Sequence, residues 1–322
     1  MKKTIIAASI AAVVAAPAAF ADVKISGQIN YEIIDADSND LGEDLNTDVA
    51  ISGSEDLGNG LKASFKLSGS PDGASDGFGD DQWFALSGDF GTVKMGRMET
   101  FSESHVRATA ANDASDANGN EVTGVVGERA NGVIAYASPK MNGLQIHAAV
   151  TSLDASTTQT SDFDQTDIGV SYSNAGLTVM VSQADGNTAI TNNTGVTETN
   201  FAVKYVMGDL TVAAVRAEQD FDAAGTTDTD ETWVGVSYKM GNNTFAASAR
   251  SSDGTTGDDN TFSVKHAMSK STSIGLTMVD AQAANSDTTT LTIAHKFSSV
   301  FRLILYKRGL RALFFYCVVY LQ

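Results

Sequence analysis

The sequence predicts an all-β protein, a closed antiparallel β-barrel of sixteen transmembrane strands with short periplasmic turns and long extracellular loops. Three observations support this prediction. Apolar and polar residues alternate with a period of two, short and long connections also alternate, and residues 22–297 contain no run near the roughly 18 consecutive apolar residues of a membrane helix. A helical inner-membrane protein is therefore excluded.

The clearest alternation comes at the start of residues 22–297. In residues 23–33 the odd positions are Val, Ile, Gly, Ile, Tyr and Ile, and the even positions are Lys, Ser, Gln, Asn and Glu. Such a strand has one apolar face and one wet face. Residues 61–68 repeat the pattern, and weaker copies follow at 168–172, 177–181 and 201–207.

Two kinds of connection separate the predicted strands. Seven short ones contain Gly, Asn, Asp, Pro or Ser, the residues of tight turns, at 55–60, 88–91, 139–143, 174–176, 207–209, 240–243 and 269–271. Eight longer polar ones lie at 35–47, 69–80, 100–127, 152–166, 184–198, 221–230, 253–259 and 281–287. Because a closed barrel pairs all its backbone groups, as hydrocarbon requires, this alternation predicts an outer-membrane barrel.

The composition changes at both ends of the chain. Residues 1–21 combine two early lysines, an apolar run and a small-residue cleavage site, which predicts a secretory signal peptide. Residues 22–297 are the predicted barrel. Residues 298–322 contain four basic residues, no acidic residue and the only cysteine, Cys317. We interpret this tail as the product of a frameshift or read-through near Phe297, with a periplasmic extension and a membrane anchor as the alternatives.

Charge and motif content exclude several classes of function. Residues 22–297 carry 15 basic and 39 acidic residues, a net charge of −24, so we expect no nucleic-acid partner. Without cysteine this segment has no disulfide framework and no cysteine-based zinc site. Its four histidines show no metal-ligand spacing, and no nucleophile elbow is present. We predict no enzyme activity and no cofactor; an outer-membrane hydrolase and a secreted soluble β-sandwich adhesin are the alternatives.

Four segments carry a family resemblance. They are GSEDLGNGLKASFKL (53–67), FALSGDFGTVKMGR (84–97), NGVIAYASPKMNGL (131–144) and the closing HKF (295–297). In this order they resemble the Gram-negative general porins, which are trimeric outer-membrane barrels. The resemblance implies passive diffusion of small hydrophilic solutes and ions through a water-filled pore, a homotrimer, and contact with outer-membrane lipid and lipopolysaccharide. It also implies that Phe297 is the signal for the barrel-assembly machinery.

The same resemblance suggests how the pore is narrowed. In the family the third long loop folds inward, and its acidic residues face basic residues on the wall. Here the third loop, 100–127, is the longest. The resemblance therefore implies constriction roles for the acids in and beside it, although a solvated surface charge is the alternative for each: Glu99, Glu103, Asp113, Asp116 and Glu121.

The wall departs from the family pattern at two positions. Where arginines are common, this chain has Asp48 and Asp81, and strand parity places both in the lumen. Two negative charges in place of two positive ones predict a pore that prefers cations. The positive wall candidates that remain are Lys62, Lys66, Lys94 and Arg129.

Overall fold

The computed structural model describes residues 22–37, 39–71, 77–110, 129–151, 165–186, 195–222, 226–253, 257–282, 286–308 and 312–321. The predicted signal peptide, residues 1–21, lies outside these ranges. Three of the predicted loop acids also lie outside them: Asp113, Asp116 and Glu121.

The described residues form seventeen strands and one helix, α2 (Phe101–Ala110). The strands are β1 (Asp22–Ala36), β2 (Asn39–Gly58), β3 (Leu61–Gly69), β4 (Gln82–Gly88), β5 (Gly91–Met98), β6 (Ala130–Ala137), β7 (Leu144–Thr151), β8 (Gln165–Asn174), β9 (Leu177–Gly186), β10 (Val196–Met207), β11 (Leu210–Phe221), β12 (Thr229–Met240), β13 (Asn243–Ser252), β14 (Asp259–Ala267), β15 (Thr272–Ala281), β16 (Thr288–Arg308) and β17 (Ala312–Leu321). Within the described residues, no helix is long and apolar enough to cross a membrane.

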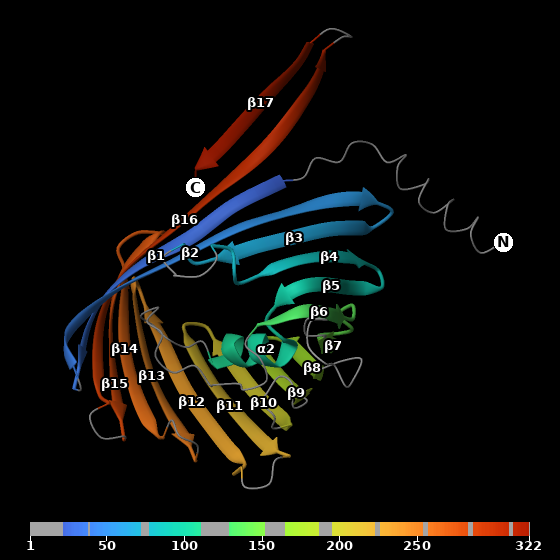
Figure 1. Cartoon of the computed structure of the whole chain (residues 1–322). Coiled ribbons are helices and arrows are strands. Elements are labelled where there is room, and N and C mark those ends of the chain that lie inside the picture. Colours follow the sequence, from blue (N-terminus) through green and yellow to red (C-terminus); the bar gives the residue numbers. More distant parts are fainter. Residues whose placement is uncertain are drawn as a thin grey trace.

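The first sixteen strands close into the antiparallel barrel that the sequence predicts (Figure 1). Each strand pairs with the next along the chain, and β1 pairs with β2 on one side and with β16 on the other. The ring therefore has no open edge among these strands. Closure of this kind pairs the backbone N–H and C=O groups within the barrel, because hydrocarbon offers them no hydrogen bonds.

The period of two separates an outer face from the lumen. On β10, Phe201 and Tyr205 are exposed on the outer face, whereas Asn200 and Ala202 are buried on the lumen side. The exposed large apolar side chains of the other barrel strands follow the same rule. The outer face is thus the surface that hydrocarbon would cover.

The prediction of a long first loop at residues 35–47 is wrong. The strand β2 begins at Asn39, and Ala36 of β1 pairs with it after a shift in register. The Tyr31 hydroxyl donates to the Glu43 carboxylate at 2.5 Å across this ladder. A run of polar side chains favours the prediction of a loop. A strand that extends beyond the apolar band can nevertheless be polar on both faces and still pair its backbone groups.

The seam between β1 and β16 is packed where Phe297 lies opposite Gly27. A Cβ atom at Gly27 would lie 2.5 Å from the Phe297 ring and 2.2 Å from the backbone oxygen of Asp48. Only a residue without a side chain leaves room for the ring. Phe297, at which the predicted barrel ends, therefore packs against Gly27 where β1 and β16 pair.

The strand β16 does not end at Phe297. Residues 298–302 continue the ladder with β1, and residues 299–308 pair with β17 to form a hairpin. The change in composition after Phe297 is therefore accompanied by no break in the strand.

We expect the substitution Gly27→Val to lower the thermal stability of the barrel. The added methyl groups would press on the Phe297 ring and on the Asp48 carbonyl, and overpacking of this kind costs about 1–3 kcal/mol. The measurement is the temperature at which the folded band is lost in semi-native electrophoresis. Gly42→Val is the matched control, since the nearest atom to its Cβ would be 3.8 Å away. Equal midpoints for the two variants would contradict the packing role.

We also expect a chain ending at Phe297 to reach the outer membrane in larger amounts than the full chain, because the terminal aromatic would then stand at the end of the last strand. Quantitative immunoblotting of outer-membrane fractions, with transcript levels matched, measures this. Equal amounts of the two chains would show that the tail does not hinder assembly.

Candidate functional site

Helix α2 opens the third long connection and lies inside the barrel (Figure 1). It packs against the lumen side of strands β7 to β12. The described part of this connection therefore folds inward and occupies one side of the lumen.

The N-terminus of α2 is held by a carboxylate of the wall. Asp167 of β8, which is only 1% exposed, accepts hydrogen bonds from the backbone N–H and the hydroxyl of Ser102, both at 2.9 Å. The Thr100 hydroxyl caps the helix by accepting from the N–H of Glu103 at 3.3 Å. A negative charge is favourable here because the helix dipole places partial positive charge at the N-terminus.

A lysine of the wall holds the other end of α2. The Lys204 ammonium of β10 donates to the backbone carbonyl of Ala108, in the last turn of the helix. Partial negative charge gathers at this end, so a cation is the favourable partner. The wall thus places charges of opposite sign at the two ends of α2, each with the sign that the helix dipole favours.

An apolar patch on the wall receives the first turn of α2. The Phe101 ring stacks on His147, with centroids 3.8 Å apart and planes at 17°. The ring lies over Gly169, where an added Cβ would be 2.1 Å from it. Phe101 also belongs to a buried cluster with six wall residues: Met180, Ala202, Ala213, Val215, Ala217 and Trp233.

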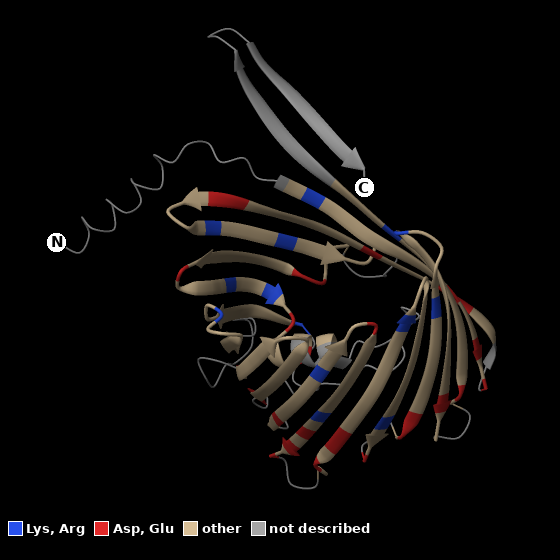
Figure 2. Ribbon diagram, turned by 180° about the vertical axis from the view of Figure 1, so that it is seen from behind, with Lys and Arg blue, Asp and Glu red and all other residues tan. Residues whose placement is uncertain are grey.

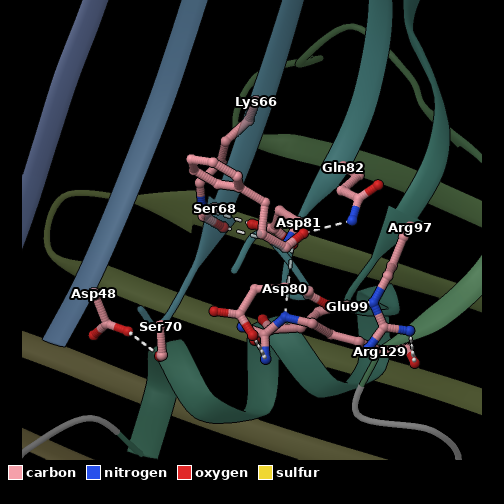
Figure 3. A network of polar contacts seen from close by, with 12 residues as sticks. Asp48, Lys66, Ser68, Ser70, Asp80, Asp81, Gln82, Arg97, Glu99 and Arg129 are labelled. Atoms are coloured by element: carbon pink, nitrogen blue, oxygen red, sulfur yellow. Dashed lines mark hydrogen bonds and ion pairs between the residues drawn. The ribbon is translucent and has the colours of Figure 1, made fainter. Parts of the chain in front are cut away.

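A group of charged residues lies on the wall formed by β2 to β6 and the segments beside them (Figure 3). We call it the wall network; its members are Asp48, Lys66, Asp80, Asp81, Glu99 and Arg129. The Lys66 ammonium lies 2.6 Å from the Asp81 carboxylate. The Arg129 guanidinium lies 2.9 Å from Glu99, 3.7 Å from Asp81 and 3.8 Å from Asp80. The Ser70 hydroxyl donates to Asp48 at 3.2 Å.

Five of the residues singled out from the sequence therefore lie in this network: Asp48, Lys66, Asp81, Glu99 and Arg129. Lys94 lies beside it: its ammonium is 4.5 Å from the ring centroid of Trp83 and interacts electrostatically with charged members of the network, Asp81 among them. Lys62 lies near the first short turn, opposite Asp56. Glu103 is in the first turn of α2 and is 4% exposed.

Sequence reasoning missed Asp80, Asp167 and Lys204. Asp80 adjoins Asp81, so a search for paired acids could have found it. The other two share the lumen-facing parity of their strands, with buried Gln165 beside Asp167 and buried Ala202 beside Lys204. Parity alone does not say that a helix from a distant connection docks on them.

Comparison with known proteins shows which family this barrel resembles. Residues 7–291 match the family model described as Gram-negative porin. The chain belongs to the Gram-negative porin family. A comparison with curated protein sequences finds no match.

Solved porin structures share the fold. An anion-selective porin from Comamonas acidovorans is 22% identical, with a TM-score of 0.67 over 86% of this chain and 100% of its own. OmpF of Salmonella typhi, solved with daunomycin, is 13% identical, with a TM-score of 0.68 over 85% of this chain and 97% of its own. OmpT of Vibrio cholerae, in a trimer form, is 13% identical, with a TM-score of 0.62 over 86% of this chain and 99% of its own. These proteins and this chain are alike in fold.

We expect the substitution Asp167→Asn to loosen α2. The amide could still bond both Ser102 groups, but the negative charge facing the positive end of the helix dipole would be lost, at a cost of about 0.3–2 kcal/mol. Single-channel recording should show more current noise and frequent sub-conductance steps. Asp185→Asn is the control, because Asp185 lies on β9 next to β8 and its carboxylate contacts Thr197 on an exposed face. Equally quiet channels in both variants would show that Asp167 does not hold the helix.

Proposed function

We propose that this porin is a general diffusion channel, a water-filled passage through the outer membrane of a Gram-negative bacterium for small hydrophilic solutes and ions. The observation that carries the proposal is the position of α2, which packs on β7 to β12 and leaves the charged wall network on the other side of the lumen. A barrel of sixteen strands is wide enough to retain an aqueous channel beside such a helix.

An outer-membrane hydrolase is the weaker proposal. The described residues contain one histidine and serine pair of the kind that hydrolases use, because His147 Nε2 lies 3.1 Å from the Ser171 hydroxyl. Both residues are 8% exposed, and Phe101 stacks on the His147 ring. A substrate carbonyl could not reach this hydroxyl while α2 is docked. The pair is better explained as part of the surface that receives α2.

We further propose that the pore prefers cations. The wall network contains four carboxylates and two basic groups, so it carries net negative charge where α2 narrows the lumen. A lumen lined by one sign of charge concentrates the opposite ion. The related Comamonas acidovorans protein is an anion-selective porin, so the family fold accommodates the opposite preference.

We propose a homotrimer as the assembly, embedded in outer-membrane lipid and lipopolysaccharide after delivery by the barrel-assembly machinery with Phe297 as its signal. The family relationship supports this, and the Vibrio cholerae protein with the same fold has a trimer form. In planar bilayers, an inserted trimer should raise the conductance in one jump and then close in three equal steps at high voltage. Single steps only would argue against three independent pores.

The proposed selectivity predicts the effect of Asp48→Asn combined with Asp81→Asn. Under a KCl gradient the unmodified porin should give a zero-current potential of cation-selective sign, and the double variant should lower the permeability ratio of potassium to chloride roughly two-fold, because two lumen charges are removed. Asp220→Asn is the control, since Asp220 is exposed and faces outward on β11.

Three outcomes of this recording are informative. A potential of anion-selective sign in the unmodified porin would refute the cation preference and keep the channel. An unchanged ratio in the double variant would remove Asp48 and Asp81 from the selectivity mechanism. Folded barrels that conduct no current would refute the diffusion channel itself.

A further inference from the structure

The lumen-facing charges are sorted along the pore axis. Three strands that run from the long-loop end to the short-turn end each carry an acid near the start and a lysine near the finish. The two residues of each pair have the same parity and so point to the same face. The pairs are Glu198 and Lys204 on β10, Glu231 and Lys239 on β12, and Asp259 and Lys265 on β14.

The strands that run in the opposite direction show the reverse order in sequence, and so the same order in space. Lys24 and Glu32 lie near the start and the finish of β1 on its lumen face. On β5, Lys94 comes early and Glu99 follows the last residue. On β3, Lys62 comes early. In Figure 2, acidic bands mark the lower ends of β10 to β15, which form the long-loop end of these strands, and another acidic band lies at the short-turn end of β2.

Lysines gather at the short-turn end. A cavity of about 700 Å³ on the lumen wall is lined by Lys24, Lys270 and Lys296. Four residues of the wall network also line it: Asp48, Lys66, Asp80 and Arg129. Lys296 pairs in register with Gln28, whose lumen-facing parity it shares. The seam of the barrel therefore carries the same positive zone that ends β10, β12 and β14.

Two acids of the long-loop end, Glu198 and Asp167, accept hydrogen bonds on both carboxylate oxygens. The two oxygens of Glu198 accept from the amides of Asn200 at 2.6 Å and Gln219 at 3.2 Å. Both oxygens of Asp167 accept from Ser102. An ionised carboxylate, which only accepts, satisfies this arrangement.

Two exceptions are neutralised locally. Arg250 lies at the long-loop end, but its guanidinium is 2.5 Å from the Asp259 carboxylate. Asp56 lies at the short-turn end, but it is opposite Lys62 in the ladder. These contacts also offset the charges of Asp259 and Lys62, so the difference between the two zones depends on Glu198 and Glu231 at the long-loop end and on the other lysines at the short-turn end.

The zones are too far apart to cancel each other. Glu198 and Lys204 are separated by six residues, which corresponds to about 20 Å along a strand. The Debye length in physiological salt is about 8 Å. Each zone therefore sets the ion concentrations in its own part of the pore.

We propose that this polarity makes the porin rectify ionic current; the inference rests on the diffusion channel proposed above. When the compartment at the long-loop end is positive, cations enter through the acidic zone and anions enter through the lysine zone, so both accumulate in the lumen. When the voltage is reversed, both are drawn out and the lumen is depleted. Current is then larger in the first direction than in the second.

The test is a current and voltage curve of channels with known orientation. A background of Cys317→Ser with Asp209→Cys, biotinylated at the short turn of residues 208–209, identifies the side at which added streptavidin changes the current. At 0.1 M KCl, where the Debye length is about 10 Å, we expect about 1.5-fold more current when the long-loop side is positive. At 1 M KCl, where it is about 3 Å, the two directions should agree.

The double variant Lys239→Glu with Lys265→Glu tests whether the lysine zone causes the rectification. It makes the end of the lysine zone negative near the short-turn ends of β12 and β14, so rectification should disappear while channels still form. Lys140→Glu is the control, because Lys140 is exposed in a short connection outside the strands and should leave the asymmetry in place.

The outcomes separate this proposal from the one it rests on. Channels with equal currents at 0.1 M KCl, a larger current in the opposite direction, or rectification that survives Lys239→Glu with Lys265→Glu would each overturn the polarity mechanism and leave the diffusion channel standing. A folded barrel without conductance would overturn both.

Discussion

The pairing of β1 with both β2 and β16 is the constraint on which the rest of this structure depends. A strand in hydrocarbon cannot leave a backbone N–H or C=O unpaired, and only a ring of strands avoids an edge. Once the ring is closed, every second side chain must point inward. The lumen, its wall network and the surface that holds α2 are consequences of that geometry, and so is the packing of Phe297 over Gly27 at the place where the ring closes.

Inside the ring, a small amount of apolar surface is used differently from an ordinary core. The cluster around Phe101 and Trp233 faces the lumen and is covered by a helix instead of by lipid. Burial gives α2 affinity for the wall, whereas Asp167 and Lys204 fix its direction, because reversing the helix would place each charge at the wrong end of the dipole. The wall of β7 to β12 therefore holds α2 in place, whereas the wall of β2 to β6 carries the charges of the wall network.

Much of the fold follows from local patterns in the sequence. Alternation in residues 23–33 and Gly-rich turns such as Asn59 and Gly60, both with positive φ, specify strands and their tight connections without distant contacts. The same reasoning ended β1 too early and began β2 too late, because it treated polar residues as loop. It identified Lys66, Asp81 and Arg129 by parity and resemblance, although their role in selectivity remains a prediction. It did not find Asp167 or Lys204, because their partners are more than sixty residues away in a connection whose path depends on the closed ring.

Gly169 has an implication for how the permeability of this porin could evolve. The residue touches no solute, yet any side chain there would occupy the space of the Phe101 ring. One substitution behind the helix would push its first turn off the wall while every charge that faces the water stayed in place. Pore size and ion preference are thereby encoded at separate positions, so mutation can alter one property without first altering the other.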